Sequence, residues 1–101
     1  DLGSAETIAD GLATRNTDPD VFAIIHELAD DLVTVNDGQL LDAIRVLLER
    51  AKLLAEPAGA ATVAALLSGK THLPEGARVV AVISGGNFDV QSRLELGYPT
   101  P

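Results

Sequence analysis

The residues best suited to bind a small molecule follow the most hydrophobic run of the chain. This run, residues 78–83, reads Arg-Val-Val-Ala-Val-Ile and is typical of a short buried strand. Ser84-Gly85-Gly86-Asn87 comes directly after it, so a hydroxyl and an amide flank two glycines. Ligands of open α/β sheets bind just outside the carboxyl ends of the strands, and glycine lets a backbone approach a planar ligand closely. The pattern predicts a ligand-facing turn at Ser84, although a serine–glycine turn alone is a weak signal.

Glu56 is a second candidate, because it lies between two apolar segments of the sequence. A carboxylate in such surroundings is costly unless it is paired or hydrogen-bonded. Two interpretations stay open: Glu56 caps a helix that begins at Pro57, or it points toward a ligand. Glutamate is a poor capping residue, so the sequence does not decide between them.

The other polar residues predict no further site. His26 and His72 have no second histidine or carboxylate at ligand spacing, so no metal site is expected. Acidic pairs at 18–20 and 30–31 fall at expected element boundaries, where carboxylates stabilise helix ends. Asp10-Gly11 is by itself an ordinary turn dipeptide. No catalytic residue is assigned.

Helices and strands of the following extents are expected to position these residues. Asp18-Pro19 is a helix start signal, and the apolar spacing predicts a helix over 19–29. The β-branched run at 32–35 predicts a strand. Asn36 and Gln39 have the spacing of a capping box, and a helix with apolar positions from 40 to 54 follows.

The second half of the chain predicts one more helix and one more strand. Pro57 breaks the preceding helix, and residues 58–68 are nearly all alanine, leucine and valine up to Gly69. A helix that is apolar all round is expected to be buried. The second strand covers residues 79–83, where the hydrophobic run ends at Ser84.

The resulting order, helix–strand–helix–helix–strand, indicates an α/β fold with a parallel sheet. Parallel sheets are covered on both faces, and two strands are too few for a stable sheet. The chain is therefore expected either to supply part of a larger sheet or to pair with a copy of itself.

Length and composition exclude several classes of protein. A chain of 101 residues allows one domain or a piece of one. The net charge of −8 repels a phosphate backbone, so nucleic-acid binding is not expected. The absence of cysteine excludes disulfides and thiolate chemistry. No apolar run is long enough for a membrane span and the N-terminus is unlike a signal peptide, so no membrane association and a cytoplasmic location are expected.

Four motifs in a fixed order resemble threonine dehydratases and serine racemases. These are pyridoxal-phosphate enzymes of the tryptophan-synthase-β-like fold. The motifs are residues 6–11 (ETIADG), 30–35 (DDLVTV), 49–60 (ERAKLLAEPAGA) and 84–87 (SGGN). Together they cover the chain from Glu6 to about Ser92, and their combination is far more specific than any one of them.

The resemblance implies pyridoxal 5'-phosphate as cofactor and three cofactor-binding residues. It makes Ser84 the residue that hydrogen-bonds the pyridine nitrogen, and it places Glu56 and Gly11 along the same side of the cofactor, Gly11 through its backbone. A neutral hydroxyl donates to an unprotonated nitrogen. An unprotonated ring is a weaker electron sink, which suits a β-elimination with a hydroxyl leaving group.

Other parts of the family pattern have no counterpart in this chain. The family's Schiff-base lysine, its glycine-rich phosphate loop and its divalent-cation site all precede the matched region. The lysines present, Lys52 inside a predicted helix and Lys70 after one, are expected to face solvent. Residues 1–95 are therefore expected to be the C-terminal portion of a pyridoxal-phosphate catalytic domain, a fragment of its parallel-sheet large domain, with 96–101 as a tail.

The leading hypothesis is a piece of a threonine or serine ammonia-lyase, which turns a hydroxy amino acid into a 2-oxo acid and ammonia. Alone it is expected to be inactive, with the missing N-terminal part of the catalytic domain and further copies of itself as partners. Serine racemase-type isomerisation is a close alternative. Two others stay open: a non-catalytic, self-associating structural module, and a small ligand-binding domain that uses Ser84 and Glu56.

Overall fold

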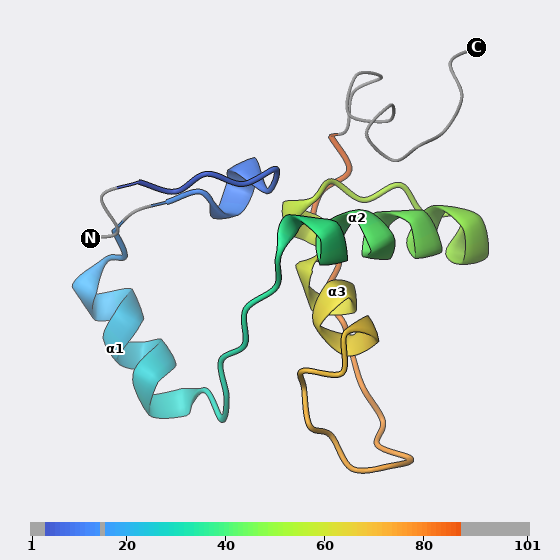
Figure 1. The fold of residues 1–101 in the computed structure, drawn as a ribbon. Coiled ribbons are helices and arrows are strands. Elements are labelled where there is room, and N and C mark those ends of the chain that lie inside the picture. Colours follow the sequence, from blue (N-terminus) through green and yellow to red (C-terminus); the bar gives the residue numbers. More distant parts are fainter. Residues whose placement is uncertain (1–3, 15, 88–101) are drawn as a thin grey trace.

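The computed structural model describes residues 4–14 and 16–87, and within these residues it contains helices and no strand (Figure 1). The helices are α1 (Pro19–Leu28), α2 (Asp37–Val46) and α3 (Ala61–Leu67). Three short turns complete them: η1 (Asp10–Leu12) and η3 (Ala58–Ala60) are 3-10 helices, and η2 (Leu47–Ala51) is a π-helical turn. The tail predicted at 96–101 lies outside the described residues.

Local side-chain caps begin α1 and α2 where the sequence predicts them. The Asp18 carboxylate accepts hydrogen bonds from the backbone N–H groups of Asp20 (2.9 Å) and Val21 (3.3 Å). Asn36 accepts from the Gln39 N–H at 2.8 Å, and the Gln39 side chain accepts from the Asn36 N–H at 2.9 Å, which completes the capping box. Both start signals are confirmed.

The end of the second helix differs from the prediction. The α-helical ladder of α2 stops at Val46 and widens into η2, and Lys52 follows with a left-handed φ of 58°. The Leu53 N–H reaches back to the Leu47 carbonyl at 3.1 Å, which closes the wide turn. The prediction that Lys52 lies inside a helix is therefore wrong. Its ammonium group donates to the Glu49 carbonyl at 2.7 Å and satisfies an end group of the helix.

The third helix ends as predicted but is less buried than predicted. Gly69 has φ 73°, and the N–H groups of Gly69 and Lys70 donate to the carbonyls of Leu66 (3.2 Å) and Ala65 (3.3 Å). These two bonds form a Schellman motif. Burial on all sides is wrong: Ala65 is buried, whereas Thr62 and Leu67 on the other face are exposed. Only the face toward α2 is covered by the rest of the chain.

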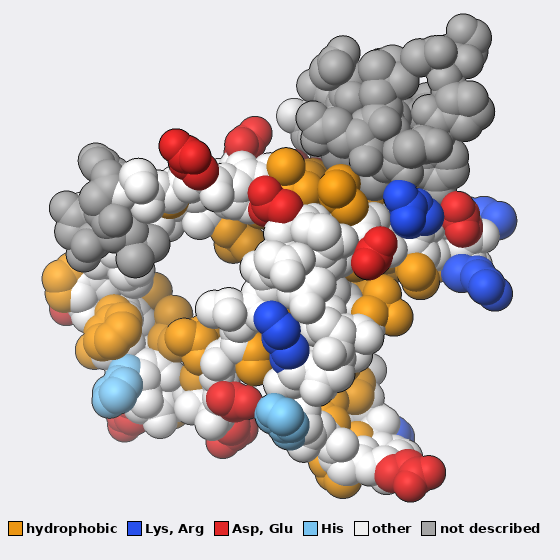
Figure 2. Space-filling model, viewed as in Figure 1, with side chains coloured by type: hydrophobic (Ala, Val, Ile, Leu, Met, Phe, Trp, Pro, Cys, Tyr) orange, Lys and Arg blue, Asp and Glu red, His pale blue; other side chains and the backbone are white. Residues whose placement is uncertain are grey.

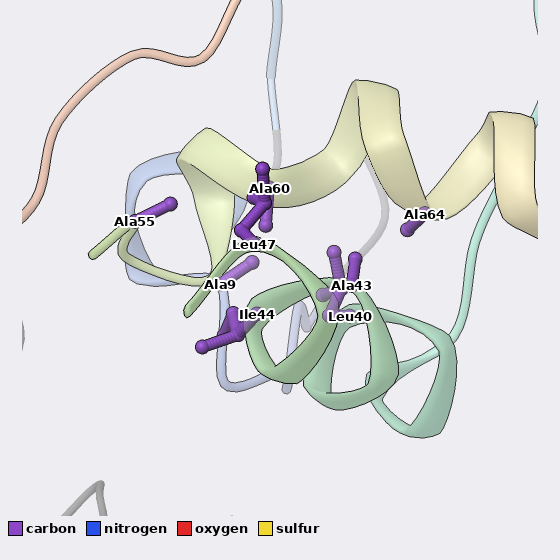
Figure 3. Packing of buried hydrophobic residues seen from close by; sticks show 8 residues of the cluster. All are labelled: Ala9, Leu40, Ala43, Ile44, Leu47, Ala55, Ala60 and Ala64. Atoms are coloured by element: carbon purple, nitrogen blue, oxygen red, sulfur yellow. The ribbon is translucent and has the colours of Figure 1, made fainter. Parts of the chain in front are cut away.

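A small aliphatic core joins α2, η3 and α3 (Figure 3). Leu40 and Ile44 of α2 are its largest fully buried side chains. The other members are mostly alanine, which lets the helices approach closely: Ala9, Ala43, Leu47, Ala55, Ala60 and Ala64. This core fixes the start of η3 relative to α2.

The two segments predicted as strands run without a hydrogen-bonded neighbour in the described part of the chain. A strand needs such a neighbour, so the sheet stays a prediction. Each segment is held to the region of α3 by a side chain instead. The Lys70 ammonium donates to the Thr34 carbonyl at 2.7 Å, and the Thr62 hydroxyl donates to the Val82 carbonyl at 2.9 Å.

The chain is open and flat. Its extents are 48 × 39 × 18 Å. It exposes 7578 Å², whereas a compact monomer of this length exposes about 5,400 Å². The helix α1 buries none of its residues, and Figure 2 shows an opening between its side of the molecule and the rest. No helix in residues 4–14 and 16–87 could cross a membrane. The large exposed surface indicates that other polypeptide normally covers part of this chain.

Truncation of the core is expected to be costly. Ile44→Ala should lower the free energy of unfolding by about 2–5 kcal/mol, because Ile44 is fully buried and the cavity cannot collapse. Val46→Ala on the same helix, at a side chain 38% exposed, should cost less than about 1 kcal/mol. Urea denaturation measures both, and equal losses would contradict this account of the core.

Candidate functional site

The three predicted site residues converge on the short helix η3, although they lie far apart in the sequence. Gly11 belongs to η1, and a Cβ built on it would be 3.1 Å from the Cβ of Ala58. Glu56 comes two residues before η3. Ser84 meets η3 through its backbone, because a Cβ on Gly59 would lie 2.8 Å from the Ser84 carbonyl carbon. The sequence named these residues, and the structure brings them together.

Gly59 makes the contact between η3 and the Ser84 turn possible. A Cβ at this position would overlap the Ser84 carbonyl oxygen and lie 3.0 Å from the Gly85 oxygen. Both obstacles are backbone atoms, so a larger residue would have to push the two segments apart. The sequence analysis did not single out Gly59. A glycine within an otherwise alanine-rich helical run was the available signal.

Glu56 contacts Gly85 with both its backbone and its side chain. Its N–H donates to the Gly85 carbonyl at 3.2 Å. Its carboxylate occupies the space where a Gly85 Cβ would be, with the carboxyl carbon 2.8 Å from that position. The side chain makes no capping hydrogen bond at η3. The capping interpretation of Glu56 is therefore wrong, and its orientation toward a ligand stays a prediction.

The glycines after Ser84 are required for two reasons. Gly85 has φ 80°, in the left-handed region that only glycine adopts without strain. A Cβ on Gly86 would lie 2.7 Å from the Leu54 carbonyl oxygen. The turn therefore lies flat against residues 54–59, with no side chain between the two backbones.

All three predicted site residues can be reached from outside. Ser84 and Gly11 are exposed, and Glu56 is half-buried. Among residues 4–14 and 16–87, nothing accepts from or donates to the Ser84 hydroxyl. A ligand with a hydrogen-bond acceptor can therefore use this donor without breaking an internal bond.

A pair of polar side chains holds the segment that carries Gly11. The Thr7 hydroxyl donates to the Asp37 carboxylate, and the same carboxylate accepts from the Ile8 N–H at 3.4 Å. The Ala9 N–H in turn donates to the Thr7 hydroxyl oxygen at 3.2 Å. Since Asp37 is the first residue of α2, these bonds tie the Gly11 segment to the core helix.

Removal of this tie is expected to loosen the segment without unfolding the core. Thr7→Val should speed hydrogen exchange of the Ile8 and Ala9 amides by about 5- to 10-fold, because about 1 kcal/mol of hydrogen bonding is lost. Thr7→Ser keeps the hydroxyl and should exchange at the original rate. Unchanged exchange in Thr7→Val would show that the tie does not hold the segment.

The remaining candidate groups are bound to the chain itself. The Lys52 and Lys70 ammonium groups donate to backbone carbonyls, as described above; Lys52 is exposed as predicted, whereas Lys70 is half-buried. The His26 ring stacks on Phe22 with ring centres 5.8 Å apart. In the part of the chain that the structure describes, no three histidine or acidic residues cluster as metal ligands would.

Comparison with known proteins places this site in a family. The family profile described as pyridoxal-phosphate dependent enzyme matches residues 1–85. This chain belongs to that family. The resemblance stated from the four motifs is confirmed, and so is pyridoxal phosphate as the cofactor of the parent enzyme.

Two curated relatives of this family member illustrate its similarities. The L-threonine ammonia-lyase of Thermotoga maritima is 45% identical over 84 residues, which are 83% of this chain and 20% of that protein. The serine racemase of Schizosaccharomyces pombe is 37% identical over 90 residues, which are 89% of this chain and 28% of that protein. The chain thus spans between a fifth and a third of these relatives.

Solved structures resemble the same region. A pyridoxal 5'-phosphate-dependent aspartate racemase matches with a TM-score of 0.78 and 34% identity, over 87% of this chain and 28% of that one. A bacterial threonine deaminase matches with a TM-score of 0.75 and 38% identity, over 83% of this chain and 30% of that one. These matches are compatible with the predicted α/β class and leave its sheet unconfirmed.

Proposed function

We propose that residues 1–95 are the C-terminal portion of the catalytic domain of a cytoplasmic pyridoxal-phosphate-dependent threonine or serine ammonia-lyase. In this proposal the chain forms one wall of the cofactor pocket and is inactive alone. The observation that carries the proposal is the convergence of Gly11, Glu56 and Ser84 on η3. The similarity to L-threonine ammonia-lyases supports the reaction class.

The residues present fit one side of the cofactor. The Ser84 hydroxyl, without an internal partner among the described residues, would donate to the pyridine nitrogen and orient the ring. The side-chain-free turn at Gly85 and Gly86 leaves room for a planar ring to lie close to the backbone. Glu56 and the Gly11 backbone would line the same side. When bound, pyridoxal phosphate supplies the electron sink for loss of the β-hydroxyl group.

The reactive amine belongs, in this proposal, to the part of the enzyme that precedes residue 1. Lys52 and Lys70 support this assignment, because each ammonium group already donates to a carbonyl of its own chain. The large exposed surface supports a partner as well. We assign the N-terminal part of the catalytic domain as that partner, and further copies of the protein as members of a homo-oligomer.

A hybrid enzyme tests the function. In it, the 84 matched residues of the Thermotoga maritima L-threonine ammonia-lyase are replaced by the aligned residues of this chain. We expect the hybrid to bind pyridoxal phosphate, seen in its visible absorption, and to release ammonia from threonine or serine. The chain alone should release none. A hybrid that elutes and folds like the parent but binds no cofactor would contradict the proposal.

The second candidate is an isomerase of the serine racemase type. The similarity to a serine racemase and to an aspartate racemase favours it. Chiral analysis of the hybrid's products separates the two: D-serine formed from L-serine without ammonia would indicate the isomerase. Size-exclusion chromatography of the chain alone addresses the structural module, since a stable oligomer without any effect in the hybrid would support that class.

A further inference from the structure

Two extended segments lie against the same helix but do not pair with each other. One groove of about 270 Å³ and a second of about 380 Å³ lie beside α3. Val33, Thr62 and Ala65 line both of them. The first groove is also lined by residues of the 79–81 segment and the second by those of the 33–35 segment. Together the two grooves form one surface, called here the α3 groove.

The α3 groove is apolar and carries exposed aliphatic side chains along its edges. Val80 is 91% exposed, Val79 is 48% exposed, and Leu32 beside the groove is 83% exposed. Most of its lining consists of alanine, leucine and valine, with Thr62 and Asp31 among the few polar residues. The backbones on both sides have no strand partner within the described residues. Such a surface favours a polypeptide that covers side chains and pairs backbones at once.

We propose that the α3 groove seats a β-strand from the part of the catalytic domain that precedes this chain. The segments 32–35 and 79–83 are then separated in the sheet by at least one strand, instead of pairing directly after their crossover. This inference rests on the proposed function, since it requires the remainder of that domain.

Strand spacing supports an inserted strand. Adjacent strands lie about 4.8 Å apart, which leaves no groove between them, whereas one inserted strand sets its neighbours about 10 Å apart. The observed arrangement is not a collapsed one: it superimposes on the aspartate racemase with a TM-score of 0.78 while covering only 28% of that chain. The two segments therefore have the spacing of a complete domain.

The occupant is better supplied by the same domain than by a second copy. The curated relatives are between three and five times longer than the part this chain matches. A strand within the same folded domain is held near the groove at a high effective concentration, which a free second copy lacks. Since parallel sheets are covered on both faces, we expect the inserted strand to be apolar on both faces.

Cysteine pairs in the hybrid enzyme measure the separation directly, because this chain has no cysteine of its own. Val33→Cys is combined in turn with Val79→Cys, Val80→Cys and Ala81→Cys. After mild oxidation and peptide mapping we expect no disulfide in any pair, because a disulfide requires Cα atoms within about 7 Å. The pair Gly11→Cys with Ala58→Cys, whose Cβ positions are 3.1 Å apart, is the positive control. A disulfide from Val33 to any of the three would overturn the proposal.

Hydrogen exchange identifies the occupant. In the hybrid, the amides of 32–35 and of 79–82 should both exchange at least about 100-fold more slowly than in the chain alone at low concentration. Equal protection in the chain alone, rising with its concentration, would indicate a second copy and overturn the proposal. A hybrid that protects both segments but releases no ammonia would sink the proposed function and keep the inserted strand.

Discussion

Gly59→Ala in the hybrid enzyme is expected to separate η3 from the Ser84 turn and to abolish cofactor binding. The added Cβ would overlap the Ser84 carbonyl oxygen, and both obstacles are backbone that cannot rotate away. Overpacking of this kind costs about 2–3 kcal/mol of stability. The functional loss should be larger than the loss of stability suggests, because Ser84 and Glu56 would both leave their positions. Absorption of bound pyridoxal phosphate and urea denaturation measure the two effects.

Gly69→Ala is the matched control for this prediction. Gly69 ends α3 with φ 73°, and a Cβ there would have no atom within 4 Å. Alanine should therefore cost about 1 kcal/mol of backbone strain and leave cofactor binding intact. If Gly59→Ala bound the cofactor as Gly69→Ala does, the close contact between η3 and the turn would not be needed for the site.

Ser84→Ala is expected to weaken cofactor binding and catalysis while leaving the fold unchanged. The hydroxyl makes no internal hydrogen bond among the described residues, so its removal breaks nothing within this chain. A bound pyridine nitrogen would lose its donor, which should lower cofactor affinity and the rate of ammonia release by about 10-fold each. Titration of the hybrid with pyridoxal phosphate, followed by an ammonia assay, measures both.

Two variants make this prediction specific. Ser84→Thr keeps the donor and should restore most of the affinity. Ser68→Ala removes a hydroxyl that donates to the Ala65 carbonyl at 3.0 Å, away from η3, and should leave affinity unchanged. Cofactor affinity equal to that of the unmodified hybrid in Ser84→Ala would remove Ser84 from the site and with it the ligand-binding role of the turn.

Much of the local structure could be predicted from the sequence. The caps at Asp18 and Asn36 and the helix end at Gly69 all depend on hydrogen bonds between residues a few positions apart, which the local sequence encodes. The end of α2 could not be predicted this way. Its apolar spacing continues to residue 54, while the backbone widens at Leu47 and turns at Lys52. Periodicity reports which side of a helix is apolar and not where its hydrogen bonding changes.

Burial and strand pairing were predicted less well, because both depend on what surrounds the chain. Residues 58–68 have the composition of a helix buried on all sides, yet Thr62 and Leu67 are exposed. The segment at 79–83 has the composition of a central strand, yet it has no strand neighbour in residues 4–14 and 16–87. In both cases the composition fits a complete domain, of which this chain spans a part in its relatives.

The sequence by itself determined the family and named Gly11, Glu56 and Ser84, since a motif records residue types and their order. Only the tertiary structure decided that these residues meet. The contacts join segments that are 28 to 73 positions apart and depend on how α2, η3 and α3 pack on Leu40 and Ile44. It also decided the role of Gly59 and the direction of Glu56, because the absence of a side chain matters only where another backbone occupies its space.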